Sequence, residues 1–181
     1  MMVIKKYNTG FILYSMMVLV MASCNMDQHL PAEEAELTQE DELFMTNAAH
    51  FNRLGLEYAR LAEQNSTDGL ILAYAIRMNE EYGLAKAQLE TLAESYEITI
   101  ADSLPHPQQT QINNLAAYDG EMFDSLYIQK NIEAFIWGQE IMEGQVATSN
   151  VQELEGYASQ QLAQINQRLY DAQLIQSEIQ Q

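Results

Sequence analysis

Apolar residues recur at three- and four-residue spacing from Glu42 onward, which places them on one face of successive α-helices. Prolines interrupt this part of the chain only at Pro105 and Pro107. The pattern predicts an all-α fold, an antiparallel four-helix bundle. Three stripes are regular: Phe44, Ala48, Phe51, Gly55, Tyr58 and Ala62; Ile71, Ala75, Met78, Tyr82, Ala85, Leu89 and Leu92; and Leu154, Ala158, Gln161, Ile165, Arg168, Ala172, Ile175 and Ile179. The remaining helix, expected at about 120–145, is apolar around much of its circumference, so the pattern does not define its inward face.

Capping residues and connections complete this picture. Thr38 to Asp41 is a variant capping box, and Asn150, followed by Glu153 three residues later, is the expected N-cap of the last helix. Short polar links join the first helix to the second and the third to the fourth, which predicts two hairpins. The middle connection is long, from about 97 to 108. It contains a β-prone triplet at 98–100 and leads to a short extra helix expected at 110–117.

The N-terminus has the features of an export signal. Lys5 and Lys6 precede an uninterrupted run at 11–22 that is shorter than the roughly 20 apolar residues of a transmembrane helix. The run ends at Met21-Ala22-Ser23-Cys24, which resembles a bacterial lipobox. We therefore predict that residues 1–23 are a lipoprotein signal peptide and that Cys24 is the lipid attachment site. The alternative is an ordinary signal peptide, in which case Cys24 is a free cysteine without a lipid.

Residues 24–41 contain many acidic and few large apolar side chains, and they are predicted to be a flexible acidic tether to a bundle at 42–181. The composition excludes several classes of function. Eight basic against 26 acidic residues give a net charge of −18, which disfavours binding to nucleic acid. A single cysteine excludes an internal disulfide. The chain also lacks the glycine-rich motifs of nucleotide-binding loops and nucleophile elbows.

The order of these features, together with two local motifs, resembles a ferritin-like family of unknown function whose members are described as outer-membrane proteins. The motifs are Met78-Asn79-Glu80-Glu81 and a glycine followed by Phe-Asp-x-x-Tyr, here Phe123, Asp124 and Tyr127. The likeness extends over roughly 43–175. It implies a ferritin-like bundle with one long connection.

Four positions of this sequence depart from the pattern that the resemblance implies. Glu is usual at the position of Gly55, and His is usual at those of Tyr82, Phe135 and Arg168. Glu81 is retained. If the polar residues form a metal or proton-handling site in relatives, that use is lost here.

Metal chemistry is also disfavoured by the residues themselves. A di-iron bundle commonly needs two Glu-x-x-His pairs, and none of the three histidines, His29, His50 and His106, has a glutamate three residues earlier. No Ser or Cys nucleophile lies in a recognisable motif. We therefore predict no metal, no cofactor and no enzymatic activity.

Arg168 lies on an apolar stripe, where a lone buried guanidinium is costly unless it is paired. If the four positions that depart from the family pattern share one layer, Arg168 lies near the rings of Tyr82 and Phe135. We therefore predict an interior layer formed by Glu81, Tyr82, Asp124, Phe135 and Arg168, in which the cation lies over an aromatic face and either acid supplies the counter-charge. The alternative is that Arg168 lies at the edge of the stripe and extends its head into water.

These observations predict a membrane-anchored envelope lipoprotein that acts by binding or structural support. Its partners would be the membrane, through Cys24, and an unidentified protein or small molecule. Asn25 is not the aspartate that retains lipoproteins at the inner membrane in enteric bacteria, which favours the outer membrane. The competing hypothesis is a metal-dependent or stress-related ferritin-like oxidoreductase.

Overall fold

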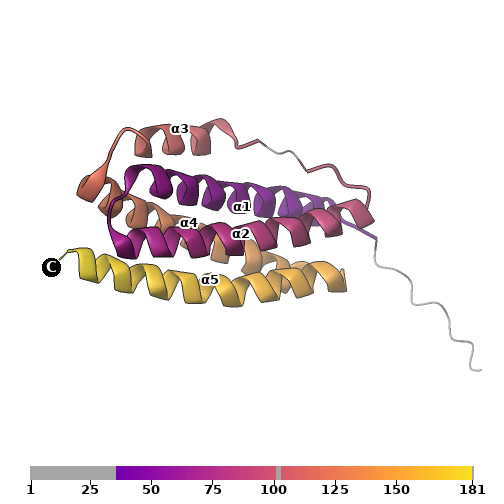
Figure 1. The fold of residues 1–181 in the computed structure, drawn as a ribbon. Helices are drawn as coiled ribbons and strands as arrows, with labels where there is room; N and C mark the ends of the chain where they lie inside the picture. Colours follow the sequence, from indigo (N-terminus) through magenta and orange to yellow (C-terminus); the bar gives the residue numbers. More distant parts are fainter. Residues whose placement is uncertain (1–35, 101–102, 181) are drawn as a thin grey trace, which may run out of the picture. The chain divides into compact units, whose positions relative to one another are not determined.

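A computed structural model of the protein describes residues 36–100 and 103–180, which form five helices and no strand. The helices are α1 (Gln39–Asn65), α2 (Gly69–Ser95), α3 (His106–Leu115), α4 (Gly120–Thr148) and α5 (Gln152–Ile179) (Figure 1). The prediction of an all-helical bundle is confirmed. The predicted signal peptide, Cys24, His29 and residues 24–35 of the predicted tether lie outside the described residues.

The start of α1 is set by the predicted capping box. The Thr38 hydroxyl accepts a hydrogen bond from the Asp41 backbone N–H, and the Asp41 carboxylate accepts one from the Thr38 backbone N–H. Asp41 is buried and also accepts hydrogen bonds from Gln145, at 2.6 Å, and Ser149, at 2.9 Å. Residues 39–41, which the sequence analysis included in the tether, are the first residues of α1. The acidic residues at this boundary belong to the first turn of a helix that is attached to the end of α4.

The start of α5 differs from the prediction. Its N-cap is Val151, which is buried and provides no capping side chain, and the expected cap Asn150 is exposed. The Ser149 hydroxyl accepts a hydrogen bond from the Val151 backbone N–H instead. Burial of the Val151 side chain thus fixes the position at which α5 begins.

The predicted stripes are buried with two exceptions, Leu92 and Ile179 near helix ends, which are only partly covered. The inward face of α4, which the sequence leaves undefined, is now visible. Ile136 is exposed, and the buried residues of this helix are Phe123, Asp124, Tyr127, Ile128, Asn131, Ala134, Phe135, Gly138, Met142 and Gln145.

Contacts between helices fix their relative directions. Hydrogen bonds join Tyr96 to Glu153 and Gln88 to Gln161, and the Arg77–Asp171 ion pair lies further along, so α2 and α5 are antiparallel. In α1 and α4, Asp41 contacts Gln145 whereas residues 51 and 137 pack together further along, so these two helices are also antiparallel.

Because α2 follows α1 through a short link, α2 and α4 run in the same direction. The connection between them must therefore span the length of the bundle (Figure 1). Tyr58 of α1 donates a hydrogen bond to Gln111 of α3, and Asn65 donates one to the Tyr118 carbonyl. The short helix begins at His106, earlier than the predicted 110, because Pro107 lies in its first turn, where a missing N–H costs nothing. No helix in the described ranges is both long and apolar enough to cross a membrane.

Candidate functional site

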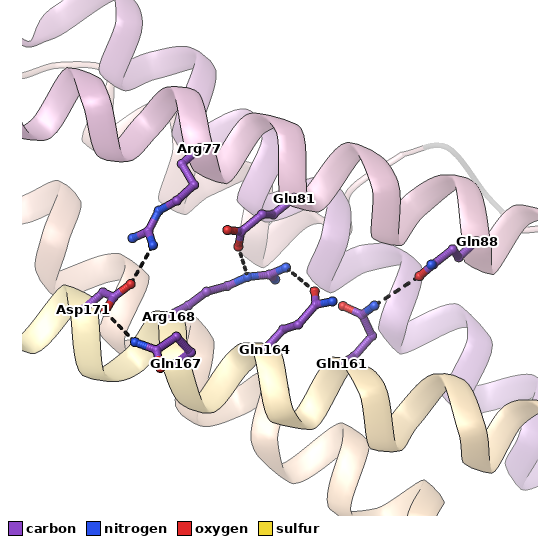
Figure 2. Close-up of polar contacts among 8 residues, drawn as sticks. All are labelled: Arg77, Glu81, Gln88, Gln161, Gln164, Gln167, Arg168 and Asp171. Atoms are coloured by element: carbon purple, nitrogen blue, oxygen red, sulfur yellow. Dashed lines mark hydrogen bonds and ion pairs between the residues drawn. The ribbon is translucent and has the colours of Figure 1, made fainter.

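The Arg168 side chain lies inside the bundle and does not extend into water. The residue is 1% exposed. Its Nε atom donates a hydrogen bond to Glu81 at 2.7 Å, and its Nη2 atom donates one to Gln164 at 2.8 Å (Figure 2). The guanidinium carbon lies 4.8 Å from the centre of the Tyr82 ring, a distance typical of a cation–π contact. Helix α5 therefore holds a buried cation against an acid and an aromatic ring of α2.

The Tyr82 ring packs directly on Gly55 of α1, which has no side chain. A Cβ atom added at Gly55 would lie 2.1 to 2.5 Å from three atoms of the Tyr82 ring, so only glycine permits this approach. The Tyr82 ring also packs edge-on against Phe51, with ring centres 5.5 Å apart. Burial raises the pKa of Tyr82 above its ordinary value, although Arg168 opposes this effect. The phenol therefore remains neutral.

Phe135 shares the level of Arg168 in the bundle. A Cβ atom at Gly138 of α4 would contact Ile165 of α5, and these two helices are joined by the hydrogen bond from Gln139 to Asn166. Because the helices are antiparallel, moving three residues back from Gly138 and three forward from Ile165 brings Phe135 opposite Arg168. Phe135 is fully buried. Four members of the predicted layer, Glu81, Tyr82, Phe135 and Arg168, thus lie at one level.

Asp124 does not belong to this layer. It precedes Phe135 by three helical turns, which is about 16 Å along α4. It lies instead beside Ser66, with which it forms a hydrogen bond. Burial raises the pKa of Asp124, and the nearby Asp68 and Glu121 carboxylates add to this effect. The prediction that Asp124 could balance Arg168 is wrong, because this separation along α4 puts Asp124 out of reach of the layer.

A groove of about 330 Å³ lies beside Arg168 between α2 and α5. Arg77, Glu81 and Arg168 line it, and the ion pairs Arg168–Glu81 and Arg77–Asp171 are each electrically neutral with a contact of 2.7 Å (Figure 2). The rest of its polar lining is amide: Gln88, Gln160, Gln161, Gln164 and Gln167. Some of these amides bond to one another, as in the 3.3 Å contact of Gln161 with Gln88. The groove is therefore a polar, neutral seam between two helices.

The sequence analysis identified Glu81 and Arg168 and placed Gln161 on the inward stripe, but it did not predict that the glutamines line a seam. Their only signal is spacing, since Gln161, Gln164 and Arg168 recur at three- and four-residue intervals and therefore lie on one face of α5.

Within residues 36–100 and 103–180, no three His, Cys, Asp or Glu side chains converge as metal ligands would. His50 lies in the middle of α1, where partial burial lowers its pKa, and His106 is an exposed first residue of α3. At the level of the layer, the polar groups are the Arg168 guanidinium, the Glu81 carboxylate, the Gln164 amide and the neutral Tyr82 phenol. This donor set does not fit a metal ion, because the single carboxylate is already bound to a cation.

The described residues form a helical bundle whose interior contains an arginine paired with a glutamate. The chain belongs to the family described as domain of unknown function DUF4142, which it matches over residues 27–175. This agrees with the predicted resemblance to a family of unknown function. Among solved structures, it is similar to a protein from Streptomyces coelicolor described as the secreted protein DUF305, with 11% identity and a TM-score of 0.66. The likeness covers 77% of this chain and 93% of that one, and it shows the fold alone. No curated protein matches the chain.

Proposed function

We propose that the protein is an envelope lipoprotein whose ferritin-like four-helix bundle is non-catalytic and acts by binding or structural support. The observation that carries this proposal is the buried guanidinium of Arg168 at the centre of the bundle. The ferritin-like assignment is supported by the parallel course of α2 and α4, which requires one long crossover connection.

A guanidinium at this position disfavours metal binding in two ways. It repels any divalent cation placed within a few ångströms in a poorly hydrated interior. It also engages Glu81, the layer's one carboxylate, in a hydrogen bond of 2.7 Å. Gly55 and Tyr82 fill the adjacent space without a chelating group, because the ring packs directly on the glycine. The layer therefore has a structural role in this account.

The membrane anchor of the proposal is Cys24, which follows the basic and apolar segments of an export signal. Acyl chains add about 0.8 kcal/mol of membrane affinity for each buried methylene group, and two or more chains are enough for stable attachment. The bundle would then face the periplasm or the cell exterior. Asn25 favours the outer membrane by the enteric sorting rule.

Metabolic labelling with a radioactive fatty acid tests the anchor. We expect label on the full chain and none on the Cys24→Ala variant, with Ser23→Ala as the matched control that retains the label. Separation of inner and outer membranes then gives the location. Label that persists in Cys24→Ala, or an unlabelled chain that is recovered only in the culture medium, would contradict anchoring.

Metal analysis of the purified full chain tests the non-catalytic role. We expect far less than one iron, manganese or zinc ion per chain after dialysis. One or more ions retained per chain would instead support the oxidoreductase hypothesis.

A further inference from the structure

A second hollow lies on another part of the molecule, between α1, α3 and α4. Its volume is about 270 Å³. The wall toward the bundle is apolar and consists of Leu54, Ala134 and the partly buried ring of Trp137. Phe51 holds this indole in place by edge-on packing, with ring centres 6.1 Å apart. The hollow therefore presents a fixed aromatic surface that the core does not fully cover.

The opposite rim is formed by planar polar side chains of α3. Gln108 and Gln111 are three residues apart and so lie on one face of this helix. The amide oxygen of Gln111 accepts a hydrogen bond from Tyr58 at 3.1 Å, which orients that amide. The amide oxygen of Gln108 is buried and has no hydrogen-bond partner within the described part of the chain. A buried acceptor without a partner is costly, and a turn of the Gln108 amide toward a donating ligand in the hollow would remove this cost.

The charges at the rim favour a neutral ligand. Lys130 and Glu133 line the hollow and form an ion pair with each other at 2.6 Å. Because these two charges are already paired, a charged ligand would lose its hydration against the apolar wall without gaining a free counter-ion. The hollow therefore favours an uncharged ligand.

We propose that this hollow binds an uncharged sugar ring. Such a ring has an apolar C–H face that stacks on an indole and hydroxyl groups at its edge that both donate and accept hydrogen bonds. The volume is slightly below the usual range for small-molecule sites, which suits a ligand of only one or two rings. In this arrangement the ring stacks on Trp137 and a hydroxyl donates to Gln108. This inference goes beyond the proposed function and does not depend on the anchor at Cys24.

Intrinsic fluorescence tests the proposal, because Trp137 is the only tryptophan of the full chain. The probes are glucose, N-acetylglucosamine and its dimer, added to the detergent-purified chain with excitation beyond the tyrosine absorption. We expect a saturable change in emission with an apparent Kd of about 1 mM, the affinity typical of so small a ligand. Glucosamine and glucuronate, which have the same ring with opposite charges, should bind more weakly than the neutral sugars.

Two variants of α3 provide the matched comparison. Gln108→Ala should weaken binding about fivefold, since it removes one hydrogen bond. Gln109→Ala, on the exposed face of the same turn, should bind as the parent does. Circular dichroism checks that both variants are folded. No saturable change with any neutral sugar, or an undiminished response in Gln108→Ala, would overturn the proposal.

Discussion

Removing either partner of the Arg168–Glu81 pair should destabilise the bundle, but by different amounts. Arg168 is 1% exposed, whereas the Glu81 side chain is 33% exposed. Arg168→Met therefore leaves behind a carboxylate that water can solvate. Glu81→Gln leaves behind a buried guanidinium without its counter-charge. The second change should be the more costly one, although both disrupt the same ion pair.

The magnitudes follow from the contacts. Removing one member of a buried pair typically costs 3–5 kcal/mol, and the amide that Glu81→Gln introduces could still accept from Nε, so we expect about 3 kcal/mol for this change. Arg168→Met loses two charged hydrogen bonds and the contact with Tyr82, but it also removes the desolvation cost of the guanidinium. We expect a net loss of about 1–2 kcal/mol. The double variant should lose less than the sum of the two.

Thermal unfolding followed by circular dichroism measures these differences. A loss of 1 kcal/mol lowers Tm by about 2–4 °C for a domain of this size, so Glu81→Gln should lower it by about 6–12 °C. Arg77→Met is the matched control in the same groove, because Arg77 is 44% exposed and its ion pair should contribute less than about 1 kcal/mol. An unchanged Tm for Arg168→Met, or a larger loss for Arg168→Met than for Glu81→Gln, would refute the reasoning.

Three further predictions concern other buried positions. Gly55→Ala should lower Tm because its Cβ would overlap the Tyr82 ring, at a cost of about 1–3 kcal/mol, whereas Gly83→Ala, with open space around it, should be neutral or stabilising. Burial alone would raise the pKa of Asp41, but its hydrogen bonds outweigh burial and lower the pKa below 3.8, the ordinary value. The ionised carboxylate therefore stabilises the fold, and Asp41→Asn should lower the free energy of unfolding at neutral pH. This loss of stability should become smaller as the pH falls below 3.8. The pKa of Asp124 is raised, chiefly by burial, so the ionised side chain opposes folding. Asp124→Asn should therefore increase the free energy of unfolding at neutral pH, and this increase should become smaller as the pH falls. Urea unfolding at several pH values checks both aspartates, and equal signs for the two variants would contradict these assignments.

The regular stripes were sufficient to predict three helices and to put Tyr82 and Arg168 on inward-facing positions, where a buried cation needs an acid such as Glu81. The prediction that Arg168 lies beside Tyr82 came from the family resemblance, which suggested that the departing positions share one layer. The stripe alone also allowed Arg168 to lie at the edge and extend into water.

The features that sequence could not place depend on register or on tertiary contacts. The inward face of α4 could not be assigned, because its all-round apolar pattern is compatible with several registers. Asn150 is a good capping residue by type, but burial of Val151 determines the start of α5. The sequence analysis expected the short helix to begin at residue 110 and so assigned Gln108 to a loop. Helix α3 begins at His106, and this earlier start puts Gln108 on the same helical face as Gln111.

The side-chain Nε–H signal of Arg168 in a ¹⁵N NMR spectrum, assigned with Arg168→Met, tests the central claim most directly. The account predicts a signal protected from exchange with water, unlike that of the half-exposed Arg60, and unchanged by one equivalent of Mn²⁺. Mn²⁺ is a paramagnetic probe that broadens signals close to a bound ion. Rapid exchange of the Arg168 signal, or its selective loss on addition of Mn²⁺, would contradict a centre filled by a paired arginine.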